Sequence, residues 1–285
     1  MQDSTTHSIF NFSLEEAQNF DAQDTLKNYR NRFYIPLTKT GEHALYFCGN
    51  SLGLQPKSVK DYLQEELDDW ARLGVDGHTH AKHPWMPYHE FLTEKMAKVV
   101  GAKPVETVIM NTLTANLHFM MVSFYRPTQK RFKILIEADA FPSDRYAVAS
   151  QAEFHGYDPK EAILEWKPSE NQSTLDYESL EALLKKHGDT IALVMIGAVN
   201  YYTGQFFDLK RIVQLAKSYG CMVGFDAAHG AGNVELDLHQ AEADFCVWCS
   251  YKYLNSGPGS LAGCFVHERH AKDKNITRFE GWWGH

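Results

Sequence analysis

GCMVGFDAAHGAGNVELDLHQAEADFCVWCSYKYLNSGPGSLAG, residues 220–263, is the stretch from which the fold of this chain can be argued. It holds two short apolar runs, residues 221–225 and 245–249, and polar side chains follow each run. Asp226 ends the first run and His229 lies within one turn of it, whereas Tyr251 and Lys252 follow the second. Ligands of open α/β sheets bind at the carboxyl ends of the strands, so Asp226 and Lys252 are expected to face one crevice.

A lysine and an aspartate at one crevice predict pyridoxal phosphate as the cofactor. This cofactor needs a lysine amine to form a Schiff base and an acid that keeps its pyridine nitrogen protonated, so that the ring can accept electrons. Lys252 and Asp226 fit those two roles. Taken singly, they would be interpreted as a solvated loop charge and a helix cap. Their order and spacing, with aromatic residues around the lysine, favour the functional interpretation.

The composition is that of an ordinary globular protein. The 285 residues, 44% hydrophobic and 22% charged, suffice for one large domain or two small ones. No apolar run is long enough to cross a bilayer, and the first ten residues do not resemble a signal peptide, so we expect a cytoplasmic protein without a membrane partner. The net charge of -8, without a basic block, argues against a nucleic-acid partner.

The cysteines are interpreted as structural. There are five of them, an odd number and widely scattered, which argues against a disulfide framework. Cys246 and Cys249 have the CxxC spacing, but both fall in an expected strand and would point to opposite faces of it. We therefore interpret them as core residues and expect no metal there.

Apolar periodicity predicts an α/β fold with a mostly parallel sheet and helices on both faces. An N-terminal arm with one or two helices is expected over residues 1–45, and a large cofactor-binding domain over 46–285. Strands are expected at residues 45–48, 108–110, 133–137, 161–166, 191–199, 221–225 and 245–249. Helices are expected at residues 13–23, from 59 onward, 88–100, 111–124, 177–187 and 209–219, with a loop at 74–87.

Two further segments carry chemistry in this arrangement. Asn111 and Thr112 can cap a helix whose free amides would bind a phosphate group. Phe141 follows a strand and could stack on a flat pyridine ring, whereas its structural interpretation is a core aromatic. His78, His80 and His83 invite a metal interpretation, which we keep as an alternative although no rigid element or partner for them is evident.

Six motifs together resemble kynureninase, a fold-type I pyridoxal-phosphate enzyme. They are NSLGLQP at 50–56, FPSD at 141–144, YYTGQ at 201–205, FDAAHGAGNVEL at 225–236, SYKYLNSGPG at 250–259 and GWWGH at 281–285. The resemblance implies hydrolysis of L-kynurenine, or of its 3-hydroxy derivative, to anthranilate or 3-hydroxyanthranilate plus L-alanine. That reaction belongs to tryptophan catabolism and to NAD biosynthesis.

The resemblance also implies roles for individual residues. Lys252 carries the cofactor, and Trp282 reaches the cofactor of a neighbouring subunit, which implies a homodimer with shared active sites. The reaction needs a general acid or base near the substrate carbonyl, and Tyr251 is our candidate for it. Ser51 and His78 are expected to bind the substrate. The expected cofactor shell is Leu113, Thr114, Phe141, Pro142, Ser143, Asp144, Asp226, His229, Tyr251, Lys252 and Trp282.

The chain departs from the family in two places. Family members continue beyond the point that matches His285 and form a small domain, so we expect that domain to be absent here. Gly197 stands where relatives can carry a hydroxyl near the cofactor. Three alternatives stay open: a catalytically incomplete fragment that binds cofactor and dimerises, another fold-type I enzyme such as a cysteine desulfurase or aminotransferase, and a metal hydrolase built on His78, His80 and His83.

Overall fold

A seven-stranded sheet forms the centre of the computed structural model, which describes residues 13–281. The strand order is β1-β7-β6-β5-β4-β2-β3. Every pairing is parallel except the two made by β7, which runs against its neighbours β1 and β6. The strands are β1 Thr107–Ile109, β2 Lys133–Glu137, β3 Ile163–Trp166, β4 Ile191–Gly197, β5 Met222–Asp226, β6 Phe245–Trp248 and β7 Gly263–Val266.

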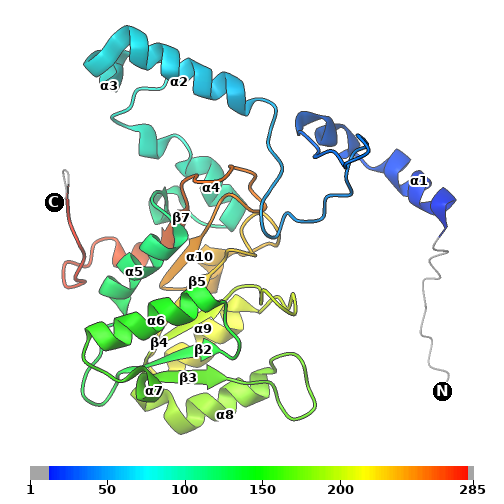
Figure 1. The fold of residues 1–285 in the computed structure, drawn as a ribbon. Helices are drawn as coiled ribbons and strands as arrows, with labels where there is room; N and C mark the ends of the chain where they lie inside the picture. Colours follow the sequence, from blue (N-terminus) through cyan, green and yellow to red (C-terminus); the bar gives the residue numbers. More distant parts are fainter. Residues whose placement is uncertain (1–12, 282–285) are drawn as a thin grey trace.

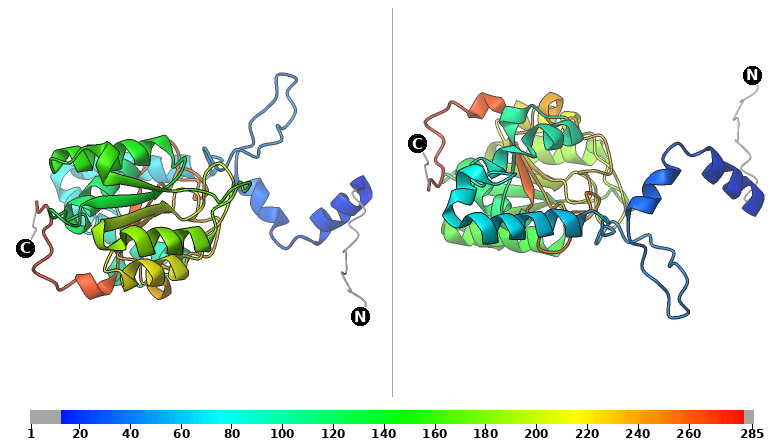
Figure 2. Two further views of the ribbon diagram at one scale, coloured as in Figure 1. Left: turned by 90° about the horizontal axis from the view of Figure 1, so that it is seen from below. Right: turned by 90° about the horizontal axis from the view of Figure 1, so that it is seen from above.

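Helices cover both faces of this sheet, as Figures 1 and 2 show. On one face Leu117 and Met121 of α5 and Val148 of α6 form a buried cluster with Phe245 of β6. The other face is packed by α8, α9 and α10 in a second cluster. Strands covered on both faces must be apolar almost throughout, which is why the runs in β4 and β6 are continuous and not alternating. The longer helices are α4 Thr93–Val100, α5 Leu113–Phe124, α6 Pro142–Phe154, α8 Tyr177–His187 and α9 Leu209–Ser218.

Short helices connect these elements. They are α7 Pro159–Ala162 and α10 Leu238–Ala241, with the 3-10 turns η4 Pro104–Glu106, η5 Gly188–Thr190 and η6 Glu268–His270. The predicted mostly parallel sheet with helices on both faces is confirmed, and most boundaries agree to within two residues. None of the described helices is both long and apolar enough to cross a membrane.

Helices α1, α2 and α3, in the segment before α4, lie away from the sheet (Figure 1). The whole segment contains α1 Leu14–Gln23, η1 Lys27–Arg32, α2 Val59–Leu73, η2 Gly74–Asp76, α3 Gly77–His80 and η3 Tyr88–Glu90, of which η3 contacts β1. The apolar side of α2 is uncovered in the single chain, with Leu63 and Trp70 exposed by 60% and 66%. An amphipathic helix with an exposed apolar stripe is typical of a surface that contacts another polypeptide.

Three local predictions were wrong in this segment. Residues 45–48 form no strand, because no neighbouring chain pairs with them, and Leu45 and Phe47 are each 90% exposed. The expected loop at 74–87 contains η2 and α3, since Gly77 packs against the ring of Trp85 and closes a tight turn. The expected helix at 88–100 is interrupted after Glu90 and restarts at Thr93.

Candidate active site

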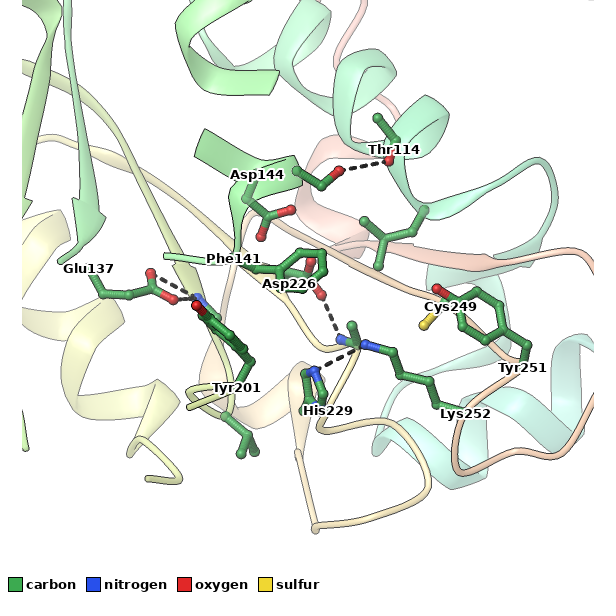
Figure 3. A pocket seen from close by; sticks show the side chains of 15 residues that line it. Thr114, Glu137, Phe141, Asp144, Tyr201, Asp226, His229, Cys249, Tyr251 and Lys252 are labelled. Atoms are coloured by element: carbon green, nitrogen blue, oxygen red, sulfur yellow. Dashed lines mark hydrogen bonds between the residues drawn. The ribbon is translucent and has the colours of Figure 1, made fainter. Parts of the chain in front are cut away.

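A cavity lies where β2, β4, β5 and β6 end, at the edge of the sheet that their parallel direction defines (Figure 3). It encloses about 550 Å³, part of which is open to solvent. Its walls come from five separate parts of the chain, so only the folded sheet creates it. The lining residues are Leu113, Thr114, Glu137, Phe141, Ser143, Asp144, Gly197, Val199, Tyr201, Asp226, Ala228, His229, Cys249, Tyr251 and Lys252.

Lys252 is held in this cavity by the loop that follows β6. The residue is only 8% exposed, and its Nζ lies 3.0 Å from His229 Nε2 and 5.7 Å from the centroid of the Phe141 ring. The Gly53 amide donates to the carbonyl of Tyr251 at 2.8 Å, and a Cβ on Gly53 would lie 2.2 Å from the carbonyl oxygen of Lys252. Glycine is therefore required at position 53 for the turn to support the lysine loop.

His229 is a neutral acceptor for the lysine. Burial, together with the positive charge of Lys252, lowers the pKa of His229 to about 4. At neutral pH the imidazole therefore carries one proton, and its other nitrogen can accept a hydrogen bond from the ammonium group of Lys252. The contact at Nε2 holds the lysine amine inside the cavity.

Asp226 and Asp144 form a buried pair of acids opposite the lysine (Figure 3). Asp226 ends β5, is 7% exposed, and accepts a hydrogen bond from the Ala228 amide at 2.6 Å. Burial raises the pKa of both carboxyl groups, and repulsion from Asp226 raises that of Asp144 further. Asp144 Oδ1 is buried with no hydrogen-bond partner among the described residues. Such a pair is stabilised by a shared proton or by a positive group placed between the acids and the lysine.

The opposite wall offers a place for an anion. Helix α5 begins at Leu113 after its cap, Thr112, whose side chain accepts from the Ala115 amide, and the other first-turn amides have no acceptor within the helix. The hydroxyls of Thr114 and Ser143 lie 3.3 Å apart beside these amides. Burial raises the pKa of Tyr251 to about 12, so this phenol remains a hydrogen-bond donor at neutral pH. Amides and hydroxyls that converge at a helix start suit a phosphate group.

Most of the predicted site residues come together here. Leu113, Thr114, Phe141, Ser143, Asp144, Asp226, His229, Tyr251 and Lys252 all line the cavity, and Pro142 begins α6 next to them. Ser51 lies in the turn before Gly53, and His78 packs edge-on against Trp85 with ring centroids 5.7 Å apart. Neither of these two lines the cavity, and Trp282 lies outside the described residues. Their functional roles stay predictions.

Sequence reasoning missed other residues of the cavity wall. Glu137, Cys249, Tyr201, Val199 and Ala228 line it without having been proposed for the site. Glu137 could have been found, because it is the last residue of an apolar strand in a parallel sheet, as Asp226 is. The others needed the tertiary structure.

The described residues do not support a metal site at His78, His80 and His83. His83 pairs with Glu65 at 3.1 Å and His80 with Thr79 at 2.8 Å, and the three histidines do not converge. Within residues 13–281 one group could hold an ion, namely Glu106, His239 and His267. Its polar atoms are already bonded: Glu106 accepts from His239 and from the amides of Lys103 and Glu268, and His267 accepts from the Arg269 amide. This group ties loops together at the opposite edge of the sheet.

A mostly parallel sheet with a buried lysine and an acid at its carboxyl edge is the arrangement of fold-type I pyridoxal-phosphate enzymes. The comparisons with known proteins agree with this class. Residues 45–263 match the family model described as aminotransferase class-V, so the chain belongs to that family. Among solved structures, it resembles a C-DES mutant with glycine covalently linked to the PLP cofactor (TM-score 0.69, 18% identity, 84% of this chain and 60% of the other). It also resembles the cysteine desulfurase CsdA of Escherichia coli (TM-score 0.66, 20% identity, 84% and 57% covered).

The curated relatives that match the chain over most of its length are kynureninases. The chain is 60% identical to the kynureninase of Myxococcus xanthus over 281 residues, covering 99% of this chain and 66% of the relative. It is 54% identical to the kynureninase of Koribacter versatilis over 275 residues, and 48% identical to that of Nematostella vectensis over 283. The chain spans 66%, 64% and 61% of the lengths of these three relatives.

Proposed function

We propose that this chain binds pyridoxal phosphate at Lys252 and supplies the cofactor-binding part of a kynureninase. The reaction is hydrolysis of L-kynurenine or 3-hydroxy-L-kynurenine to anthranilate or 3-hydroxyanthranilate plus L-alanine. The observation that carries the proposal is the meeting of Lys252, Asp226 and Phe141 in one cavity of a chain 60% identical to a kynureninase over 281 residues.

The residues present fit the cofactor. The buried Asp144 Oδ1 has no partner among the described residues, which suits a site completed by a protonated ring nitrogen. The start of α5 with Thr114 and Ser143 suits a phosphate. Phe141 lies beneath the lysine amine and offers a ring face for stacking. When bound, pyridoxal phosphate supplies an aldehyde that bonds to amines and a protonated ring that accepts electron density from the substrate.

The side chains of this chain then hold and move protons. Lys252, once its amine is free, can accept the proton from the α-carbon of the substrate. His229 keeps that amine in place through Nε2. Asp226 and Asp144 hold a proton at the inner end of the cavity, where burial excludes water. Tyr251 keeps its own proton at neutral pH and can donate it as a general acid near the substrate carbonyl.

A homodimer with shared active sites is part of this proposal. The exposed apolar stripe of α2 supports it, because such a surface is stabilised when a second polypeptide covers it. Residues 1–45 would contribute to subunit contacts, and Trp282 would reach the cofactor of the neighbouring subunit. We also propose a cytoplasmic location, since all five cysteines are free thiols, as expected in a reducing compartment.

The first experiment is cofactor loading. The purified chain is mixed with pyridoxal phosphate, its visible absorption is recorded, and borohydride reduction is followed by peptide mass mapping, with Lys252→Ala as the control. We expect a visible band in the wild type and a stable adduct on Lys252. No band, or an adduct spread over surface lysines, would contradict the proposal.

Turnover assays then separate the alternatives. Release of anthranilate from kynurenine supports the proposed reaction, whereas cofactor loading without turnover supports a fragment that binds cofactor only. Alanine release from cysteine would favour a cysteine desulfurase. A cysteine desulfurase needs a mobile, reactive thiol. Cys264 does not suit that role, because it lies in β7 and burial raises its pKa to about 12.

A further inference from the structure

Glu137 lies in the wall of the same cavity, at the end of β2. It is the last residue of β2 and is 5% exposed. Figure 3 shows its carboxyl group directed toward the end of β4, on the far side of Asp226 from Lys252. A buried carboxyl group in this position needs a hydrogen-bond partner, and the arrangement of the strands supplies one.

The partner is the backbone amide of Gly197. The parallel pairing of β2 with β4 is shifted by an irregularity after Lys133, and its last pair is Leu135 with Val194. The two strands have therefore ceased to pair before Gly197, and its amide is left to the side chain of Glu137. That amide lies 3.1 Å from Oε1 and 3.2 Å from Oε2 of Glu137.

This contact depends on the missing side chain at position 197. A Cβ added to Gly197 would lie 2.9 Å from Glu137 Oε1, closer than real Cβ contacts allow. The carboxyl group of Glu137 therefore occupies the space that a side chain at position 197 would fill. The position of the Glu137 carboxyl group therefore depends on glycine at position 197.

The surroundings make Glu137 the third acid of a buried cluster. Burial raises its pKa to about 7, and the charge of Asp226 adds to the rise, while hydrogen bonds from its own amide and that of Gly197 oppose it. Asp144 in turn feels the charges of Asp226 and Glu137. The titratable groups that share the cavity with Glu137 are Asp226, Asp144, Lys252, His229, Tyr201, Cys249 and Tyr251.

We propose that Glu137 is a positioning residue that tunes the acid pair Asp226–Asp144, and through it the proton on the cofactor ring. When Glu137 is ionised, its negative charge favours a proton held at the inner end of the cavity. When it is protonated, that support is lost. Glu137 thus makes the affinity for a positively charged ring depend on pH. This inference rests on the proposed function, because it assigns a partner to the cofactor that Lys252 would carry.

The central test compares wild type with Glu137→Gln. At about pH 6 the wild-type acid is protonated and neutral, as glutamine is, so the two proteins should bind pyridoxal phosphate equally. At about pH 8 the wild-type acid is ionised, and Glu137→Gln should bind on the order of tenfold more weakly, a factor that corresponds to an interaction of about 1.4 kcal/mol between two charges inside a protein. The two proteins are compared at the same pH, as the ratio of their dissociation constants. Protonation of the free cofactor affects both constants equally and therefore does not change this ratio. Equal affinities at both pH values, or an equal loss at both, would overturn the proposal.

Gly197→Ala is the second variant, and it leaves the acid in place. Its added Cβ displaces the carboxyl group from the Gly197 amide, so the ionised form of Glu137 loses a hydrogen bond and its pKa should rise further. The pH at which affinity improves should then move upward without disappearing. If the pH dependence of the affinity for pyridoxal phosphate is the same in Gly197→Ala and wild type, the inferred dependence of Glu137 on Gly197 is wrong. Glu153→Gln, on the exposed side of α6, is the matched control and should behave as wild type.

An infrared titration of the cofactor-free chain makes the result independent of the proposed function. Protonated and ionised carboxyl groups absorb at different frequencies, so Glu137 should contribute one protonated carboxyl signal that disappears near pH 7 and is missing in Glu137→Gln. If pyridoxal phosphate forms no adduct on Lys252 of the wild-type chain, the proposed function is wrong. The infrared signal would still show whether Glu137 is protonated. The absence of any difference between the two titrations would overturn the inference.

Discussion

Replacing Asp244 by asparagine tests how the edge of the sheet opposite the cavity is held together. Asp244 precedes β6, and its side chain is 2% exposed. Its Oδ1 accepts from Lys217 Nζ at 3.1 Å, from an Arg269 nitrogen at 2.5 Å and from His270 Nε2 at 2.8 Å. Its Oδ2 accepts from the Val223 amide of β5 at 2.7 Å. One carboxylate thus joins α9, β5 and η6.

The expected loss follows from this geometry. Burial by itself would raise the pKa of Asp244, but hydrogen bonds from His270 and Arg269, together with the charge of Lys217, outweigh it and hold the pKa well below its usual range. An asparagine at this position would keep an acceptor for the Val223 amide and leave the cationic groups without their counter-charge. Removing one partner of a buried ion pair costs about 3–5 kcal/mol, and we expect Asp244→Asn to lower the free energy of unfolding by that amount.

Urea unfolding at pH 7, followed by circular dichroism, measures the difference. Wild type, Asp244→Asn and the exposed control Glu153→Gln are compared at equal m-values. An acid with a lowered pKa stabilises the fold above its unfolded pKa, so in wild type this contribution should disappear as the pH falls below about 4. A difference of less than about 1 kcal/mol between Asp244→Asn and wild type at pH 7 would refute the reasoning.

Other parts of the structure lead to three more predictions. Gly224→Ala should lower the free energy of unfolding by about 3 kcal/mol in the same urea assay, because the new Cβ would lie 2.0 Å from the ring of Phe245; a loss below about 1 kcal/mol would contradict this packing. A thiol reagent should modify one cysteine per native chain, the exposed Cys48, and all five in denaturant, whereas rapid modification of more than one in the native chain would show that the core opens. Because the pKa of His229 is lowered to about 4, the free energy of unfolding should decrease as the pH falls from about 6.5 to 4, by no more than about 3 kcal/mol. His229→Gln should make the free energy of unfolding depend less on pH in this range. An unchanged dependence would contradict the lowered pKa of His229.

The chain order of strands and helices was readable in the sequence because each element carries its own pattern. The run at 133–137 and the helix at 177–187 match β2 and α8 residue for residue. The run at 45–48 has the same apolar character, yet it forms no strand. A strand exists only through hydrogen bonds to a neighbour, and the local sequence does not contain that neighbour.

The candidate site shows the same division. Asp226 and Lys252 could be placed together from the sequence, because parallel strands bring their carboxyl ends to one edge of a sheet. The hydrogen bond from Lys252 to His229 and the buried pairing of Asp226 with Asp144 depended on loops whose paths no periodicity encodes. Ser51 and His78 were expected near the substrate, and they lie outside the lining of the cavity.

By itself the sequence determined the fold class and the order of the elements, since these depend on side-chain periodicity. It also predicted that Asp226 and Lys252 face one cavity, because both follow strands that end at the same edge of the sheet. The tertiary structure alone decided that Glu137 rests against Gly197, because that contact arises where β2 and β4 have stopped pairing. It likewise decided the direction in which the pKa values of the buried acids shift. A pKa depends on burial and on charges brought together from distant parts of the chain, and only packing determines both.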